Sequence, residues 1–170
     1  MDAIRDLIIG TLAGWGVPAQ CITALISMIP LLELRGAIIA ASLLDLPIVQ
    51  TFIIAVLFNM VPIPFILIFI DSIFKWMKTK KHLEKIPNYL EAKALKKSDK
   101  IEKYGYFGLL LFVGIPLPGT GAWTGSLLSV LMRLDKKKSL LYIFMGVLLA
   151  GLIMTLAFYG IFDLIIGLFV

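Results

Sequence analysis

Two charged residues stand next to a long apolar stretch near the start of the chain. Glu33 and Arg35 follow an uncharged run over residues 7–32. Ionisable groups at membrane depth are costly and nearly always face a protein interior or an aqueous cavity. Pro30 and Gly36 favour a non-helical tip, on which side chains two positions apart share one side. Arg35 could then contact an anionic substrate, with Glu33 positioning it or carrying a proton; alternatively, the two form a buried ion pair that only fixes the fold.

A second candidate site lies at the centre of an apolar run over residues 105–132, where prolines and glycines would interrupt a helix. Irregular backbone at membrane depth is tolerated where it lines a cavity or packs against protein. Helix N-termini that end there attract anions, and threonine hydroxyls add donors; tight packing of small residues is the alternative. The candidate residues are Pro116, Pro118, Gly119, Thr120, Gly121, Trp123 and Thr124, and Asn59 in an earlier apolar run would face the same cavity.

The composition is that of a membrane protein rather than an enzyme. Hydrophobic residues make up 60% of the chain and the mean hydropathy is +0.99, whereas soluble domains contain about 45–50% apolar residues. The single Cys21 and the single His82 exclude a disulfide framework, histidine-based metal sites and a catalytic triad. We therefore expect no enzyme activity, no metal and no cofactor.

The positive charge of the chain is concentrated between Lys75 and Lys103. This stretch has ten lysines and four acidic residues, a net charge of +6, while the whole chain carries +5. The excess of basic residues therefore comes from this one loop and does not indicate nucleic-acid binding. The positive-inside rule places the loop in the cytoplasm. Its pattern predicts an amphipathic helix on the membrane surface, broken at Pro87, with a solvated loop as the alternative; either would attract anionic headgroups.

Two further apolar runs, over residues 46–70 and 139–162, are long enough to span the hydrocarbon. The run over residues 105–132 has basic residues on both flanks, so both of its ends are expected in the cytoplasm. We predict a re-entrant hairpin there, with arms of about 11 residues that each reach ~16 Å. Ile29, Pro30 and Leu31 match Ile115, Pro116 and Leu117, which predicts that the first half repeats this plan. If Asp71 is cytoplasmic, the first hairpin enters from the outside and the two halves are inverted, a plan common among secondary transporters.

The predicted fold class is therefore an all-α membrane protein with two inverted repeats, each a re-entrant helical hairpin followed by a transmembrane helix. Residues 1–170 form one integral membrane domain: a first repeat (1–71), a basic amphipathic cytoplasmic linker helix (72–103) and a second repeat (104–170). Residues 2–16 are expected to form a short interfacial helix, with a short spanning helix as the alternative. Because so few spans can hardly enclose a wide pathway, we expect a homodimer.

The motifs at residues 30–37 and 115–125 resemble those of the small multidrug export family of prokaryotic membrane proteins, and the similarity covers essentially the whole chain. That family is distantly similar to the DedA/VTT lipid-transport proteins, which have paired re-entrant hairpins and move polyprenyl phosphate or phospholipids. The resemblance implies a multi-pass protein of the prokaryotic inner membrane. The DedA/VTT pattern has arginines in both hairpins, whereas the run over residues 105–132 has none, so a two-arginine phosphate site does not carry over.

Three functions follow as alternatives. The first is a flippase or translocase for an anionic lipid or polyprenyl phosphate, bound at the midplane by facing hairpin tips. The second is a small-molecule (multidrug) exporter coupled to protons through Glu33. The third is a non-transporting membrane scaffold or assembly factor, in which the hairpin charges only set the fold. One arginine, two threonines and backbone donors favour a negatively charged substrate.

Overall fold

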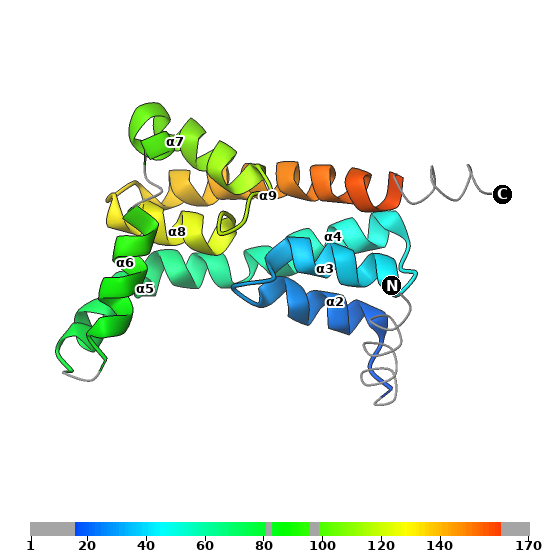
Figure 1. Cartoon of the computed structure of the whole chain (residues 1–170), viewed down its shortest axis with the longest axis horizontal. Coiled ribbons are helices and arrows are strands. Elements are labelled where there is room, and N and C mark those ends of the chain that lie inside the picture. The colour runs from blue at the N-terminus through cyan, green and yellow to red at the C-terminus, as the bar shows by residue number, and fades with distance from the viewer. Residues whose placement is uncertain (1–15, 81–82, 96–98, 161–170) are drawn as a thin grey trace. The chain divides into compact units, whose positions relative to one another are not determined.

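The structure, a computed structural model, describes residues 16–80, 83–95 and 99–160, and every regular element within them is helical (Figure 1). The predicted all-α class is confirmed. The interfacial helix expected over residues 2–16 lies almost wholly outside the described residues. The chain divides into two compact units, Met1–Asn59 with Leu149–Val170 and Met60–Leu148, which are described separately below as the first and second units.

Within the described residues, two helical stretches are long and apolar enough to cross a membrane: Ile48–Lys78 and Lys136–Gly160. They correspond to the runs predicted to span, although the first continues to Lys78 instead of ending near Ile70. Asp71 and Lys75 form an i,i+4 ion pair of 2.8 Å on these added turns, which supports the helix after the apolar run ends. Only 33% and 39% of the two most apolar windows are buried, as expected for side chains that face lipid.

Each of these long stretches contains an irregularity. The first consists of α4 (Ile48–Met60) and α5 (Pro62–Lys78), which are separated at Val61. Pro62 has no N–H, so the carbonyl of Phe58 loses its usual helical donor. Val61 keeps helical backbone angles (φ −55°, ψ −49°), so the helical path continues through this point. The second consists of α9 (Lys136–Thr155), which changes into a π-helical turn, Leu156–Gly160.

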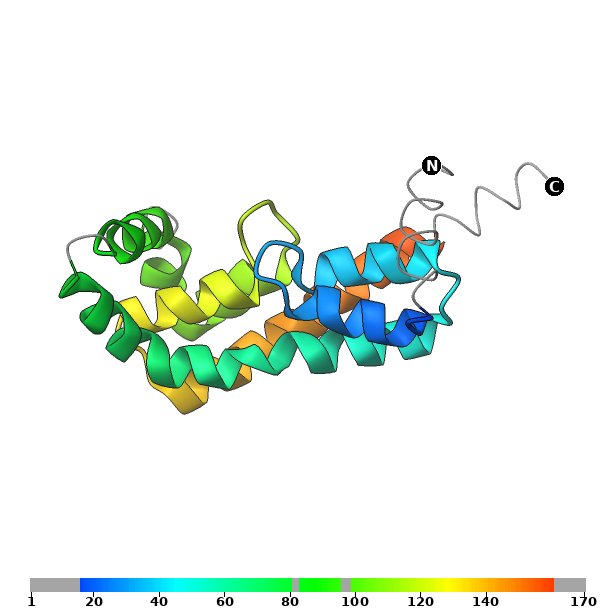
Figure 2. The ribbon, with the colours of Figure 1, turned by 90° about the horizontal axis from the view of Figure 1, so that it is seen from below.

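A helical hairpin forms most of the first unit. Helices α2 (Ala19–Met28) and α3 (Glu33–Leu43) lie side by side, joined by a short turn (Figures 1 and 2). Ser27, in the last turn of α2, donates a 2.6 Å hydrogen bond to the carbonyl of Ala55 in α4. This bond ties the hairpin to the first half of the long helix.

A partly buried pair of hydroxyls joins α4 and the π-helical turn in the first unit. Thr51 of α4 and Tyr159 of the π-helical turn are 2.8 Å apart through their hydroxyls, and Tyr159 also donates to the carbonyl of Leu46 at 2.9 Å. Since Tyr159 has only one hydroxyl hydrogen, Thr51 is the donor in the pair. These bonds hold the end of the second long stretch against the start of the first.

A second helix–loop–helix lies in the second unit, formed by α7 (Asp99–Gly114) and α8 (Ala122–Leu131). The backbone of Gly105 (φ 58°, ψ −133°) is not helical and divides α7 into two helical pieces. Val113 is packed closely by two glycines, because a Cβ at Gly125 or at Gly146 would come within 2.6 or 2.7 Å of its side chain. Small residues at these positions therefore let α7, α8 and α9 approach one another.

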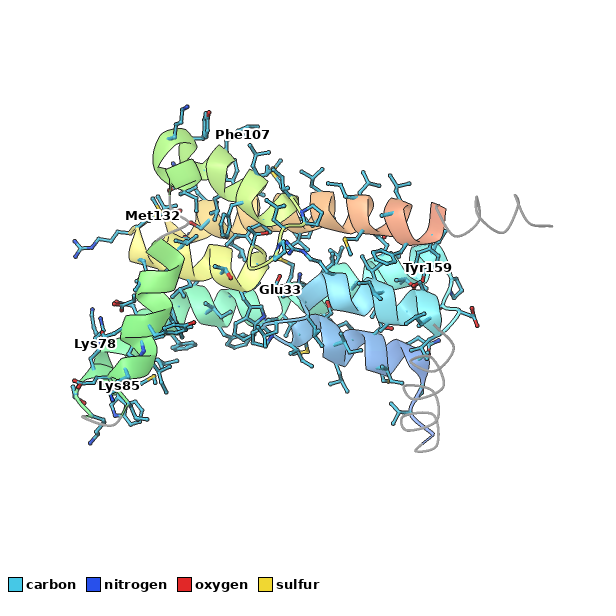
Figure 3. The ribbon with its side chains drawn as sticks, viewed as in Figure 1. Glu33, Lys78, Lys85, Phe107, Met132 and Tyr159 are labelled. Carbon is cyan, nitrogen blue, oxygen red and sulfur yellow. The ribbon has the colours of Figure 1, made fainter. Side chains whose placement is uncertain are left out.

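Helix α6 (Lys85–Leu95) belongs to the predicted linker and runs across α5 and α8, with which it is in contact (Figure 1). Lys78 of α5 and Glu91 of α6 form a 2.7 Å salt bridge, and Figure 3 shows Lys78 and Lys85 on either side of the turn that joins the two helices. The prediction of a helix here is confirmed, but the predicted break at Pro87 is wrong. Pro87 lies in the first turn of α6, where a missing N–H is tolerated.

Candidate substrate site

The tip of the first hairpin is shorter than the sequence pattern predicts. The turn ends when the N–H of Glu33 bonds to the carbonyl of Ile29 at 2.8 Å, and α3 begins at Glu33 itself (Figure 3). The expectation that Glu33 and Arg35 share an extended tip is therefore wrong, since Arg35 lies in the first turn of a helix. Gly36 does not interrupt this helix; it makes room for Leu32, whose Cβ would lie 2.7 Å from a Cβ at position 36.

The backbone of Glu33 has a left-handed conformation, with φ at 50°. This region is unfavourable for a residue other than glycine, asparagine or aspartate, and persists only where the surrounding structure enforces it. The conformation places the Glu33 side chain inside the protein, with an exposed fraction of 6%. The carboxylate also lies at the N-terminus of α3, whose partial positive charge favours an acid at that position.

Arg35 is partly exposed and lies close to an acidic residue. Its side chain is half-buried, and it interacts electrostatically with Glu33. A guanidinium presents a planar fork of donors that matches a phosphate or a carboxylate. Pro30 is exposed in the turn before α3, five residues before Arg35. The first tip can therefore bind an anion through Arg35, or carry a proton on Glu33.

The loop of the second helix–loop–helix is held by its own hydrogen bonds. The hydroxyl of Thr120 bonds to the carbonyls of Ile115, at 3.0 Å, and Leu117, at 2.8 Å. Gly119 (φ 74°) and Gly121 (φ 137°) have backbone conformations that side chains disfavour. The hydroxyl hydrogen of Thr120 is thus directed to the loop itself, which gives this residue a role in shaping the tip.

The remaining predicted residues of the second tip fall on two elements. Pro116 is half-buried, whereas Pro118 and Gly119 are exposed on the loop. Trp123 and Thr124 are half-buried in the first turn of α8 and not on the loop, because the helix begins at Ala122. The sequence pattern identified the helix break correctly but placed its end about three residues too late.

Asn59 is the most deeply buried of the predicted site residues in the first unit. It lies in the last turn of α4, its exposed fraction is 1%, and its Oδ1 has no hydrogen-bond partner. Residues four apart share a helix face, so Asn59 lies one turn beyond Ala55, to which Ser27 of the hairpin is bonded. Asn59 is therefore close to the level at which the first hairpin contacts the long helix.

The structure groups the predicted site residues by unit. Pro30, Glu33, Arg35 and Asn59 belong to the first unit, and the residues from Pro116 to Thr124 belong to the second. That the two tips face one cavity stays a prediction.

Sequence reasoning missed the polar residues that fasten the first unit. Ser27, Thr51 and Tyr159 make the bonds described above, and Ser27 and Thr51 are fully buried. One signal was present: Thr51, Ala55 and Asn59 are small or polar residues spaced four apart in an otherwise apolar run. This spacing marks a single helix face and indicates contact with protein and not with lipid.

Comparison with known families gives one match. The family model described as "Putative small multi-drug export protein" matches residues 33–153, which include α3 to α8 and most of α9. No curated protein and no solved structure gives a significant match.

Proposed function

Since the chain belongs to the small multi-drug export protein family, we propose that it is a membrane transporter that moves an anionic lipid headgroup, such as that of a polyprenyl phosphate, across the bilayer. The observation that carries this proposal is the half-buried Arg35 in the first turn of α3, a basic side chain within a mainly apolar hairpin. The lipid tail would remain in the bilayer while only the headgroup enters the protein.

The surroundings of Arg35 support an anionic ligand. Arg35 belongs to the first turn of α3, and the backbone N–H groups and partial positive charge at this end of the helix also favour anions. Glu33 is buried, with a left-handed backbone conformation, whereas Arg35 is half-buried. Glu33 can therefore orient Arg35, whose guanidinium has five N–H donors in a planar fork suited to a phosphate.

Liposomes that contain the purified protein and a fluorescent prenyl phosphate test this proposal. A hydrogen bond to a charged group contributes about 1.5–3 kcal/mol, so Arg35→Gln should slow lipid movement by roughly 10- to 150-fold. Arg35→Glu should abolish it, because the local charge is reversed. Lys75→Gln is the matched control: it removes a basic side chain from an exposed surface pair and should leave the rate unchanged. Equal rates for the wild type and Arg35→Glu would contradict the proposal.

A second candidate function is proton-coupled export of small molecules, which the family description and the buried Glu33 favour. A buried carboxylate that alternates between protonated and ionised forms is a common coupling device in transporters. In this case Glu33→Gln should stop the export of a cationic dye driven by a pH gradient, and Arg35→Gln should not. Dye export that depends on Glu33, without movement of the lipid phosphate, would select this function over the first.

A further inference from the structure

A short basic turn joins α8 to α9 in the second unit. Residues 133–138, called the basic turn below, contain the exposed basic side chains Arg133, Lys136, Lys137 and Lys138. The candidate span Lys136–Gly160 begins within this turn. The end of a span lies where the hydrocarbon meets the lipid headgroups, so the basic side chains of the turn are placed at headgroup level.

The end of α5 lies close to the basic turn, at the same end of the second unit (Figures 1 and 2). Lys136 Nζ donates a 3.5 Å hydrogen bond to the carbonyl of Ile68, and Asp71 interacts electrostatically with Lys136 and Arg133. Asp71 is itself paired with Lys75 at 2.8 Å. One carboxylate is therefore shared among three basic side chains, and positive charge is in excess here.

The stability of α9 gives no reason for this charge. Lys136, Lys137 and Lys138 occupy the first turn of the helix, where its partial positive charge disfavours cations. Asp135 acts there as an N-cap, and its Oδ1 accepts the N–H of Lys138 at 2.9 Å. Among the residues that the structure describes, no acidic side chain forms a salt bridge with these lysines or with Arg133. Their charges are therefore available to a partner outside the protein.

Two tyrosines lie beside the basic turn. The rings of Tyr106 and Tyr142 stack with centroids 5.4 Å apart, and Lys138 Nζ lies 5.9 Å from the centroid of Tyr106. The hydroxyl of Tyr106 accepts the N–H of Asp135 at 3.0 Å, so its hydrogen is not used in that bond and can be donated. Tyrosines favour the membrane interface because the ring is apolar and the hydroxyl is polar.

We propose that the basic turn and Tyr106 bind the phosphate groups of the anionic phospholipids that form the bilayer. Ammonium, guanidinium and phenol groups all donate to phosphate oxygens, and basic side chains near an anionic membrane surface are attracted to it. A contact at the protein surface exchanges with the surrounding lipid and is lost on dilution into detergent. This surface is separate from Arg35 and does not depend on the transport function proposed above.

The test measures thermal unfolding of the full-length protein at low salt, in detergent micelles that contain either phosphatidylcholine or an equal amount of phosphatidylglycerol. A lipid that binds only the folded state raises Tm. The wild-type Tm should be about 5–10 °C higher with phosphatidylglycerol when this lipid exceeds its Kd roughly a hundredfold. High salt should reduce the difference, because it screens exposed charges.

Lys136→Gln/Lys138→Gln should weaken the binding of phosphatidylglycerol. Each basic side chain near an anionic surface contributes roughly fivefold in affinity. The double variant should therefore bind about 25-fold more weakly, and the rise in Tm should fall to about a third. Lys136→Arg/Lys138→Arg should keep the rise, since it retains both charges.

Lys80→Gln/Lys85→Gln is the charge-matched control. These lysines are exposed near the turn between α5 and α6, and the exposed Glu84 between them offsets their attraction for anions. This variant should keep the rise in Tm. Arg35→Gln should also keep it while losing movement of the prenyl phosphate, which separates failure of the basic turn from failure of the proposed function.

Equal wild-type Tm values with the two lipids would overturn the proposal. An equal loss of the rise in the Lys136→Gln/Lys138→Gln variant and in its control would also overturn it, because the effect would then come from overall charge. Should the first variant fail to fold, Arg133→Gln decides. Removing this one charge should lower the rise by about a third, and an unchanged rise would exclude the basic turn.

Discussion

Glu33 and Arg35 are two positions apart, yet their environments differ. The left-handed backbone of Glu33 directs its carboxylate into the protein, and helix α3, which starts there, carries Arg35 to a half-buried position. The acid is thus held in place by the fold, while the guanidinium is accessible to a ligand.

The two roles of this pair make different predictions for stability. If Arg35 serves a ligand, Arg35→Gln should lose activity but change Tm by only about 1–3 °C, because the side chain is half-buried. If the pair is structural, removing one partner leaves an uncompensated charge that costs about 3–5 kcal/mol, and removing both is close to neutral. Thermal unfolding of both single variants and of the Glu33→Gln/Arg35→Gln double variant distinguishes them. A strongly destabilised Arg35→Gln that the second change rescues would assign the pair to the fold.

At the scale of elements, helix length bears on how the hairpins meet the membrane. Helices α2, α3 and α8 have 10, 11 and 10 residues, and at 1.5 Å per residue each is ~15–17 Å long. Such a helix reaches only about halfway through a ~30 Å hydrocarbon layer. Because the backbone of Gly105 is not helical, α7 consists of two shorter helical pieces, and each is also too short to cross the hydrocarbon layer. These lengths suit arms that enter and leave on one side, as the sequence predicts.

Cysteine labelling tests the re-entrant geometry of α7 and α8. Cysteines placed at Tyr104 and at Lys136, in a Cys21→Ser background because the native thiol is exposed, should both react from the cytoplasmic side. A membrane-impermeant maleimide added to intact cells should therefore leave both unlabelled, and permeabilisation should expose both. Labelling of only one position in intact cells would show that the segment crosses the bilayer.

The packing of α9 against α7 predicts which glycines can be replaced. A Cβ at Gly146 would lie 2.7 Å from the Cβ of Val113 and 2.8 Å from the carbonyl of Leu110. Overpacking of this kind typically costs about 1–3 kcal/mol, so Gly146→Ala should lower Tm by roughly 2–12 °C. Gly160→Ala is the control, since no atom lies within 4 Å of its added Cβ. Equal Tm values for the two variants would show that α7 and α9 are not packed this closely.

The sequence predicts elements well where a single physical signal dominates. Apolar run length identified both long helices, and the cluster of Pro116, Pro118 and Gly119 identified the interruption between α7 and α8. The prediction was wrong at Pro87 and Gly36, because residues that interrupt a helix interior are tolerated in its first turns. The burial of Glu33 and the hydroxyl contacts of Thr51 with Tyr159 depend on tertiary packing, which hydropathy does not report.

At the scale of the whole molecule, the long helices expose large apolar side chains. Leu57, Phe65 and Leu152 have exposed fractions of 58%, 61% and 53%. Lipid would cover such surfaces in a monomer, and a second copy of the chain would cover part of them in a dimer. Because the described residues contain two candidate spans, a single copy offers little protein to surround a headgroup pathway. We therefore propose a homodimer as the transporting form.

Native mass spectrometry of the gently extracted protein tests the dimer and the ligand together. The main species should have twice the 18.8 kDa mass of the chain, with additional mass that corresponds to an anionic lipid. Arg35→Gln should keep the dimer but lose the added lipid, because it removes a charge-assisted contact and leaves the exposed faces of the long helices intact. Lys75→Gln should retain both, since Lys75 belongs to an exposed ion pair. A monomer with bound lipid would refute the dimer alone, whereas equal lipid retention by the wild type and Arg35→Gln would refute Arg35 as the headgroup contact.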